Sequence, residues 1–325
     1  MSHFEVALGP TVQFEPGLYA IDAPFEDAPL TAYVITGRRL TVIDAGVVDT
    51  PKAHIAPALA KLGRSLSDIE LAVVTHAHHD HIGGLTELRS ANPRLEIAAA
   101  QAEARWIENT SVFLEENYCG YRPLYNPDEA FLERARRLKG GDQSVDRHLL
   151  DGDVIDIGDG HTLRIYSVPS HSAGHIAVLH VEADVLFTGD SLIARGHPFS
   201  RRQDSFPLYA DVARYSALLD LYEELNPKWT ATAHHGLCNR DQLRFLIRES
   251  RNLIGEIDDF LLSLAREKKD GLSLEFVVGA MAKHWPRYAR RVSSYTTAHA
   301  HMTELVRRGH LRVTESNPWE WRQVN

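Results

Sequence analysis

The sequence predicts an α/β fold with one large domain and a smaller C-terminal one. Strand-like and helical stretches alternate over the first hundred residues, and short, closely spaced strands return between residues 154 and 187. From about residue 241 helical patterns dominate. A chain of 325 residues also exceeds what one core of ordinary size holds. We therefore expect a large domain over residues 1–240 and a second domain over residues 241–325.

The composition is that of an ordinary globular protein. Hydrophobic residues make up 44% and charged residues 24%, which excludes a wholly disordered or collagen-like chain. No apolar run approaches the length that a membrane helix needs, and the first residues do not have the pattern of a secretory signal. Two cysteines, Cys119 and Cys238, cannot form a disulfide framework, which predicts a reducing, cytoplasmic location.

Each element of the large domain has a local reason. Pro51 and the helix formers after it predict a first helix to about Leu62, and helical patterns also cover 85–90 and 211–224. Short apolar and β-branched runs bounded by turn residues predict strands. These runs lie at 18–21, 31–36, 40–43, 71–74, 95–98, 154–157, 163–168, 176–181, 185–187 and 229–232.

Residues 101–147 differ from their surroundings because strand signals vanish there. Two amphipathic helices are expected, around 102–117 and 128–138, which makes this stretch a helical insertion. It is rich in aromatic residues, namely Trp106, Phe113, Tyr118, Tyr121, Tyr125 and Phe131. Two interpretations are open: the aromatic side chains pack on the main domain, or they line a substrate pocket as a lid.

The C-terminal segment predicts three helices followed by a hairpin. The helices cover about 241–269, 273–285 and 293–308, and the hairpin pairs 311–314 with 319–322. This order suggests a winged-helix-like module, which would bind DNA or serve in packing or homodimer formation. Its 14 Lys and Arg exceed its 11 Asp and Glu by only three, and the whole chain has a formal charge of −9, so nucleic acid is a disfavoured partner.

The strongest chemical signal is the string from His76 to His81, directly after the strand 71–74. It reads His-Ala-His-His-Asp-His. On an extended turn His76 and His78 point the same way, while Asp80 and His81 face a second point nearby. Histidine and carboxylate ligands suit zinc, iron or manganese, so the string predicts a metal site.

Three later loops also present ligand-type residues after a strand. They contain His171 in Pro-Ser-His-Ser-Ala-Gly-His, Asp190 in Thr-Gly-Asp-Ser, and the pair His234-His235 before Gly236. Loops at strand ends are where a scaffold commonly presents chemistry.

Taken together, these motifs resemble those of the metallo-β-lactamase-fold hydrolases, nearest the glyoxalase II-like branch. The resemblance runs from about residue 17 to 240. It implies an αββα sandwich, in which two sheets pack face to face with helices outside. The C-terminal segment resembles the winged-helix appendage of some members of this family.

The resemblance also implies a dinuclear centre, with two divalent ions that are zinc, or alternatively iron or manganese. His76, His78 and His171 would hold one ion and Asp80, His81 and His235 the other, with Asp190 bridging them. His235 is preferred to His234 because the family ligand directly precedes the glycine. His79 is interpreted as a non-ligand, and His175 and Asp44 as residues that support the ligands.

The expected activity is hydrolysis of a thioester, ester or lactone carbonyl by a hydroxide that bridges the two ions, with Asp80 as the catalytic residue that orients it. The substrate would be a small acyl compound. Arg195, Arg201 and Arg202 are candidates to bind its anionic group, and Tyr121 is a further substrate contact. Antibiotic hydrolysis is disfavoured because true β-lactamases of this fold generally carry a cysteine at the second metal, and Cys238 lies too far from the matching motif.

Other classes remain as alternatives. An RNA or phosphodiester hydrolase would use the same centre together with a basic track towards the C-terminal module. A mononuclear iron dioxygenase would not use the ligands of the second metal ion. A regulatory binding protein would not need a complete set of metal ligands. The sequence retains every ligand type, which favours the hydrolase.

Overall fold

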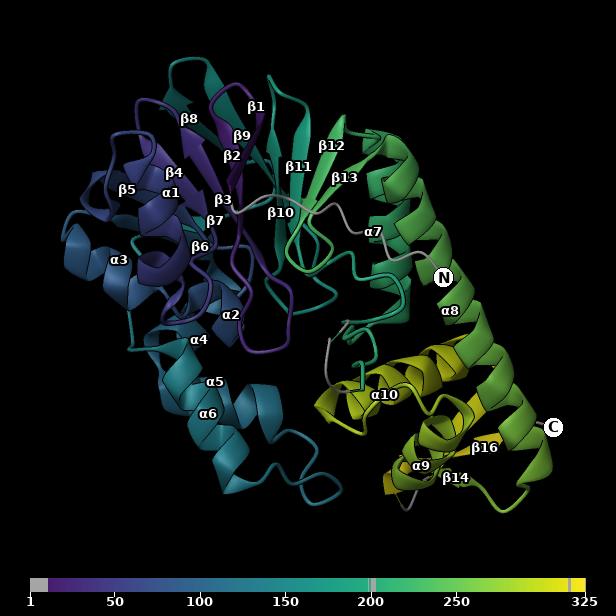
Figure 1. The fold of residues 1–325 in the computed structure, drawn as a ribbon. Helices are drawn as coiled ribbons and strands as arrows, with labels where there is room; N and C mark the ends of the chain where they lie inside the picture. The colour runs from purple at the N-terminus through teal and green to yellow at the C-terminus, as the bar shows by residue number, and fades with distance from the viewer. Residues whose placement is uncertain (1–10, 198, 200–202, 315–316, 325) are drawn as a thin grey trace.

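Two β-sheets packed face to face form the centre of the molecule (Figure 1). The computed structural model describes residues 11–197, 199, 203–314 and 317–324. The first sheet has the order β1-β2-β3-β4-β5-β6-β7 and the second β13-β12-β11-β10-β9-β8. The strands of the first sheet are β1 (Thr11–Glu15), β2 (Leu18–Asp22), β3 (Thr31–Thr36), β4 (Leu40–Ile43), β5 (Ile69–Val73), β6 (Glu96–Ala100) and β7 (Arg147–Leu149). Those of the second are β8 (Val154–Gly158), β9 (His161–Ser167), β10 (Ile176–His180), β11 (Val185–Gly189), β12 (Trp229–Thr232) and β13 (Leu237–Asn239).

Strand direction explains the sequence pattern of each sheet. Strands β1 to β4 pair antiparallel, whereas β4 to β7 run parallel, and parallel strands need helical crossovers between them. The second sheet is antiparallel except for the pair β11–β12, which helix α7 (Val212–Leu225) connects. The short strands β1, β7 and β13 were not predicted, and all three lie at sheet edges.

Apolar side chains fill three layers of the sandwich. The middle layer joins both sheets, with Val73 and Ile43 of the first packed in one cluster with Ile165 and Phe187 of the second. The outer face of the first sheet packs under a helical stretch formed by Pro51–Ile55 and α1 (Ala56–Ala60), and under α3 (Leu85–Ala91). A short turn, Leu66–Asp68, precedes β5. The outer face of the second sheet is covered by α7 and by α8 (Arg240–Glu267). The predicted αββα sandwich is thus confirmed.

The insertion forms three helices rather than the two predicted. They are α4 (Gln101–Glu108), α5 (Thr110–Tyr118) and α6 (Glu129–Lys139). The single helix expected over 102–117 is broken at Asn109, whose side chain accepts hydrogen bonds from the backbone N–H groups of Ser111 and Val112. Asparagine in this role starts a new helix because it satisfies N–H groups that have no partner within the helix.

The C-terminal segment adds two helices and a small sheet to α8. These are α9 (Leu274–His284), α10 (Val292–Arg307) and the strands β14 (Leu272–Ser273), β15 (Leu311–Thr314) and β16 (Asn317–Gln323), in the order β14-β16-β15. Helix α8 contributes Leu243 and Ile247 to the core beneath the second sheet, and Ile257 and Leu261 to the C-terminal core. A domain boundary at residue 240 stays a prediction, since this one helix belongs to both cores.

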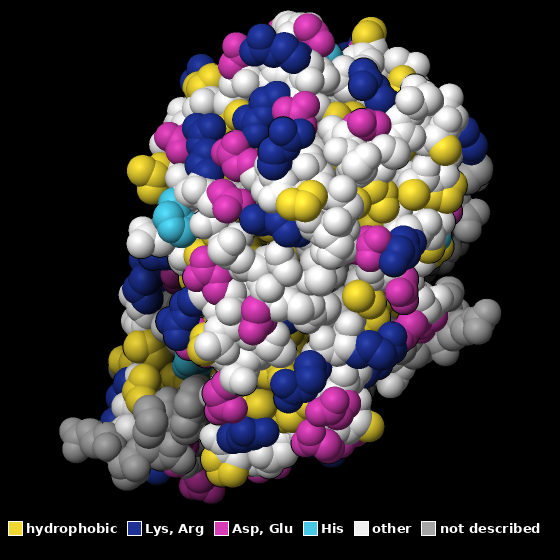
Figure 2. All heavy atoms as spheres, turned by 90° about the vertical axis from the view of Figure 1, so that its left-hand side faces the viewer, with side chains coloured by type: hydrophobic (Ala, Val, Ile, Leu, Met, Phe, Trp, Pro, Cys, Tyr) yellow, Lys and Arg dark blue, Asp and Glu magenta, His cyan; other side chains and the backbone are white. Residues whose placement is uncertain are grey.

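The surface on the α3 side of the molecule carries charges of both signs. Figure 2 shows Lys and Arg side chains interspersed with Asp and Glu side chains on this face. Among the described helices, none combines the length and the apolar character that a membrane-spanning segment requires.

Candidate metal centre

Four loops bring histidine and aspartate side chains together at one edge of the two sheets. The loop after β5 leads into the short helix α2 (His79–Ile82), and the other loops follow β9, β11 and β12. The first ligand group comprises His76, His78, His171 and Asp190. The second ligand group comprises Asp80, His81, Asp190 and His234. Within each group the candidate ligand atoms all lie within 4.8 Å of one another, and Asp190 belongs to both.

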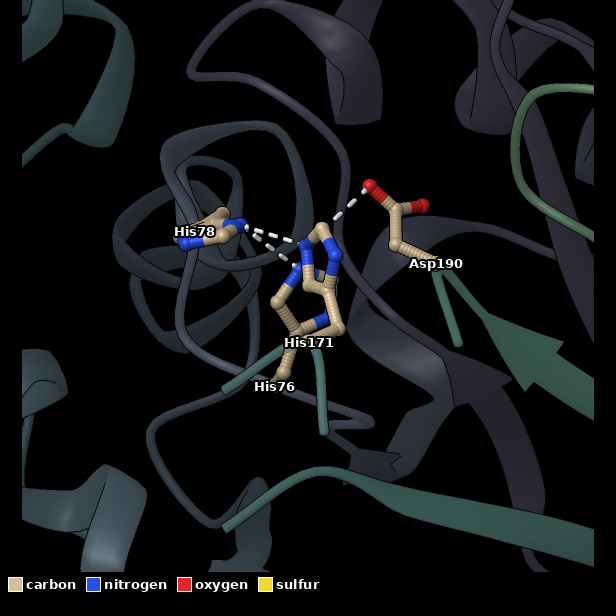
Figure 3. A group of neighbouring side chains, drawn as sticks. All are labelled: His76, His78, His171 and Asp190. Carbon is tan, nitrogen blue, oxygen red and sulfur yellow. Dashed lines mark hydrogen bonds and ion pairs between the residues drawn. The ribbon is translucent and has the colours of Figure 1, made fainter. Parts of the chain in front are cut away.

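In the first ligand group three imidazole nitrogens face one point (Figure 3). The Nδ1 atom of His78 lies 3.0 Å from His76 Nε2 and 2.9 Å from His171 Nε2. The carboxylate of Asp190 closes the group, 3.6 Å from His171 Nε2. Burial and the neighbouring imidazoles hold the pKa of His76 and His171 well below the usual range, and burial lowers that of His78 to about 4. These rings are therefore neutral at pH 7, as metal ligands must be.

In the second ligand group carboxylates and imidazoles alternate. His81 Nε2 lies 3.3 Å from Asp190 Oδ1, and His234 Nε2 lies 3.3 Å from Asp190 Oδ2 and 3.4 Å from Asp80 Oδ2. Burial opposes the charged form of His234, but Asp190 and Asp80 outweigh it and raise its pKa to about 10. Burial also opposes ionisation of Asp80 and Asp190, yet nearby histidines keep both pKa values well below the usual range. The two carboxylates thus require positive charge beside them.

The donor atoms fit divalent metal ions. His81 Nε2, His234 Nε2 and Asp190 Oδ1 are buried and have no hydrogen-bond partner among the described residues. Buried polar atoms without partners are costly, so three of them close together indicate a site suited to a cation. Nitrogen and carboxylate oxygen are ligands that zinc, iron and manganese accept.

The second nitrogen of each imidazole is held by an acceptor, which fixes the direction in which the ligand nitrogen points. His171 Nδ1 donates to the carbonyl oxygen of Leu208 at 2.8 Å, and His234 Nδ1 donates to that of Pro29 at 2.7 Å. These bonds put the proton on Nδ1 and leave Nε2 free to bind a metal. The other three imidazoles have equivalent contacts. His81 Nδ1 lies 2.8 Å from the carboxylate of Asp44, and His78 Nε2 lies 3.0 Å from the side-chain oxygen of Asn117. His76 Nδ1 lies 3.2 Å from the hydroxyl of Thr75.

One glycine is required for this close packing. Gly189 precedes Asp190 with a φ of +50°, and a Cβ atom there would lie 2.4 Å from Thr75 Oγ1 and 3.0 Å from His175 Nε2. Any side chain would push the loop that carries His76 away from the end of β11, where the loop that carries Asp190 begins.

The structure brings six of the seven predicted ligands together and replaces the seventh. His234, and not His235, lies in the second ligand group. The predicted choice of His235 is therefore corrected to His234, because the chain turns between the two residues. The Nε2 atom of His235 is buried without a hydrogen-bond partner among the described residues, and burial together with His234 lowers its pKa to about 4.

The supporting residues lie largely where the sequence suggested. Asp44 accepts hydrogen bonds from Thr75 N, Thr75 Oγ1 and His81 Nδ1. The ring of His175 stacks on that of His76 at a centroid distance of 4.5 Å. His79 is in neither group, and its Nδ1 atom instead pairs with the hydroxyl of Tyr118 at 2.8 Å.

Both ligand groups open into a cavity of about 500 Å³ between the insertion, the large domain and the start of α10. Tyr118, Tyr125 and Phe131 of the insertion line it, whereas Phe113 is buried in a core beneath α5 and α6. The insertion thus packs on the first sheet through Trp106 and forms one wall of this cavity, and its role as a lid over a substrate stays a prediction.

The predicted substrate contacts do not gather there. Arg195 does not line the cavity and instead pairs with Glu256 at 2.5 Å and Glu249 at 3.8 Å. Tyr121 packs against Tyr295 in the C-terminal core, with ring centroids 5.8 Å apart. Both side chains are instead held by contacts with the C-terminal module, and their role in substrate binding stays a prediction. Arg201 and Arg202 lie outside the described residues.

Three further residues of the centre were not predicted. His197 Nε2 lies 2.9 Å from Asp190 Oδ2 and lines the cavity. Asn117 orients His78 from α5, and the carboxylate of Glu103 in α4 bonds to two ligand loops. None of these three residues stands in a ligand-like motif. The only signal in the sequence was the high overall histidine content, which applies to His197 alone.

The segment 203–210 couples the C-terminal module to His171. On one side, the carbonyl oxygen of Leu208 accepts the hydrogen bond from His171 Nδ1. The backbone N–H of Ala210 donates to the carbonyl oxygen of Ser170 at 2.9 Å. On the other side, Tyr209 Oη lies 2.7 Å from His301 Nε2, and His301 Nδ1 lies 2.6 Å from Asp258 Oδ1. Tyr209 and His301 are almost fully buried, so this chain of contacts fixes the acceptor that orients His171.

Replacing Tyr209 with phenylalanine should therefore weaken metal binding from a distance. Removal of the hydroxyl leaves His301 Nε2 buried without its partner, at a cost of about 1–3 kcal/mol in the free energy of unfolding. We expect up to about a tenfold weaker metal affinity, measured by competition with a chromophoric chelator. The partly exposed Tyr19, substituted in the same way, serves as the control. An unchanged affinity in Tyr209→Phe, with the stability loss present, would show that the contact does not reach His171.

Comparisons with known proteins agree with this architecture. The sequence profile of the metallo-beta-lactamase superfamily matches residues 27–234. A hydroxyacylglutathione hydrolase from Cereibacter sphaeroides is 32% identical over 154 residues, which cover 47% of this chain and 45% of that protein. The chain thus matches slightly less than half the length of that relative. A metallo-beta-lactamase fold-containing protein from Sulfurisphaera tokodaii is 31% identical over 229 residues, covering 68% of this chain and 79% of that protein.

Solved structures extend the likeness beyond the sandwich. A metallo-beta-lactamase family protein from Thermus thermophilus superposes with a TM-score of 0.76 at 20% identity, covering 96% of this chain and all of the other. A beta-lactamase domain protein from Burkholderia ambifaria gives a TM-score of 0.73 at 18% identity, over 97% and 93% of the two chains. These two show a shared fold that includes the C-terminal module. With the profile match and the relative from Sulfurisphaera tokodaii, they lead to one conclusion: the chain belongs to the metallo-beta-lactamase superfamily.

Proposed function

We propose that this protein is a hydrolase of carboxylic thioesters, esters or lactones that uses two divalent metal ions, with zinc as the first candidate. The observation that carries the proposal is that Asp190 belongs to both ligand groups, beside a cavity of about 500 Å³. A shared carboxylate is what a pair of closely spaced ions needs, and the cavity has the size of a small-molecule site.

The first and second ligand groups would each hold one ion. Ions bound there would supply Lewis-acid chemistry, polarising a substrate carbonyl and lowering the pKa of a water molecule towards neutrality. Asp80, which lines the cavity, would accept a hydrogen bond from the attacking water and orient it. Asp44 and the carbonyl of Leu208 keep the protons of His81 and His171 on the nitrogens that face away from the centre.

The cavity walls support an acyl substrate. Phe25, Tyr118 and Phe131 present aromatic surface, which favours an acyl chain or ring over a bare phosphodiester. The relatives from Cereibacter sphaeroides are named as hydrolases of an acylated glutathione, which is consistent with a thioester. Neither ligand group contains a cysteine, and Cys238 contacts the backbone carbonyl of His235 instead.

Elemental analysis of the purified protein combined with a substrate screen tests this proposal. We expect two equivalents of divalent metal, and hydrolysis of thioesters, esters or lactones that stops when a chelator removes the metal. The variant Asp80→Ala should lose metal and fall at least about a hundredfold in turnover, since even residues that only support a ligand cost 10–100-fold. Full activity without metal would refute the proposal. Cleavage of a fluorogenic RNA but of no acyl compound would favour the phosphodiesterase alternative.

A further inference from the structure

The start of helix α10 forms part of the wall of the catalytic cavity. Arg291, Val292 and Ser293 line the same space as His171, Asp190 and His234, although they belong to the C-terminal module. Helix α10 is 16 residues long, and its first turn presents backbone N–H groups that have no partner within the helix. The positive end of its dipole therefore faces the cavity from this wall.

The side chain of Ser293 gives independent evidence for a ligand at this place. Ser293 is only 6% exposed, and its Oγ atom is buried with no hydrogen-bond partner among the described residues. A hydroxyl buried in this way forfeits hydrogen bonds that water would provide, at a cost of about 1–3 kcal/mol. A ligand in the cavity that Ser293 lines would supply the absent partner.

Arg291 adds a positive charge beside this hydroxyl, and its neighbours hold the side chain in place. Its guanidinium donates to Ser205 Oγ at 3.0 Å and to the carbonyl oxygen of Gln203 at 3.4 Å, and it lies 4.9 Å from the centre of the Phe199 ring. These contacts fix the orientation of the guanidinium at the cavity wall. A held guanidinium suits recognition of carboxylate and phosphate groups.

The opposite wall of the cavity, which the insertion forms, does not favour an anionic group. Arg134 of α6 also lines the cavity, but its guanidinium binds both carboxylate oxygens of Glu26, with Nε 2.8 Å and 3.1 Å away. Asp128, which caps α6, lines the cavity as well and would repel an anion. The charges on the insertion wall therefore disfavour an anionic group there.

We propose that Arg291, Ser293 and the first turn of α10 form a subsite for an anionic group of the substrate, so that the C-terminal module selects acyl substrates that carry a carboxylate or phosphate. This inference rests on the proposed hydrolase function for its substrate class. It assigns to Arg291 an anion-binding role of the kind that the sequence suggested for Arg195, Arg201 and Arg202.

Two thioesters of equal length test the subsite, one ending in a carboxylate and the other in a neutral carboxamide. In Arg291→Gln, KM for the carboxylate substrate should rise about 10–100-fold, because hydrogen bonds to charged groups contribute about 1.5–3 kcal/mol. KM for the carboxamide, kcat and metal content should stay within about twofold. Arg291→Lys should restore much of the KM, and Ser293→Ala should show a smaller rise. Arg312→Gln, an exposed arginine of the same module, is the matched control.

Equal rises in KM for both thioesters, or no change for either, would overturn the subsite. Calorimetric binding of a non-hydrolysable thioether that ends in a carboxylate separates this inference from the proposed function. If the wild-type protein binds the thioether and Arg291→Gln does not, the subsite holds even where no thioester is cleaved. A thioether that ends in a phosphate, measured in parallel, decides which anion the subsite prefers. If the wild-type protein binds neither thioether, the subsite is refuted.

Discussion

Replacing His234 with alanine is expected to remove one of two bound metal ions and nearly all hydrolytic activity. The Nε2 atom of His234 lies within 3.4 Å of carboxylate oxygens of both Asp80 and Asp190, so its loss opens the second ligand group while the first keeps all of its members. The fall in turnover should exceed about a hundredfold, since residues that merely support a ligand already cost 10–100-fold. Elemental analysis and thioester hydrolysis measure the two effects on the same sample.

The adjacent residue provides the matched control. His235→Ala removes an identical side chain one position later, which belongs to neither ligand group. We expect two metal ions and turnover within about threefold of the wild type, together with a modest stability change typical of a partly buried substitution. The reverse pattern, with metal lost in His235→Ala and kept in His234→Ala, would contradict the assignment made from the structure.

Replacing Glu103 with alanine should disorganise the metal centre without removing a ligand. The buried Glu103 carboxylate accepts hydrogen bonds from Ala77 N at 2.8 Å, from Ser172 Oγ at 2.8 Å and from Gly174 N at 2.7 Å. It therefore ties the loop that carries His76 and His78 to the loop that carries His171. Alanine leaves three buried donors unsatisfied, at about 1–3 kcal/mol each, so we expect the free energy of unfolding to fall by at least about 3 kcal/mol.

Metal affinity distinguishes this positioning role from general stability. Glu103→Ala should bind metal about 10–100-fold more weakly, and Glu103→Gln should be intermediate because one carbonyl oxygen can still serve Ser172 and Gly174. Denaturant unfolding and chelator competition measure the two quantities. The exposed Glu129→Ala, also in the insertion, should change stability by no more than about 0.5 kcal/mol. A stability loss with wild-type metal affinity would show that Glu103 does not position the ligand loops.

Much of the fold could be read from local patterns because the core elements are long or strongly apolar. The run 71–74 predicted a buried strand, observed as β5 over Ile69–Val73, and the helix predicted over 128–138 is observed as α6 over Glu129–Lys139. The short edge strands β1, β7 and β13 escaped prediction because three to five residues on one sheet edge bury little apolar surface. The break at Asn109 escaped because the amphipathic pattern continues across it.

The choice between His234 and His235 required tertiary information. Both residues follow the same strand and precede the same glycine, so their chemistry in the sequence is equivalent. Only the path of the turn decides which imidazole faces Asp190, and the carbonyl of Pro29, more than two hundred residues away, holds the selected ring. The sequence also did not show that Arg195 and Tyr121 lie outside the cavity lining, since their partners Glu256 and Tyr295 lie in the C-terminal module.

The sequence alone determined the kind of fold, the strand ends that carry chemistry and six of the seven residues that gather at the centre, because metal-ligand side chains cluster in short motifs beside apolar strands. The tertiary structure decided the seventh residue, the supporting contacts of Glu103 and His197, and the composition of the cavity walls. Those features depend on contacts between loops and helices that form only after the two sheets pack and α8 brings α10 beside the metal centre. No local sequence pattern predicts such contacts.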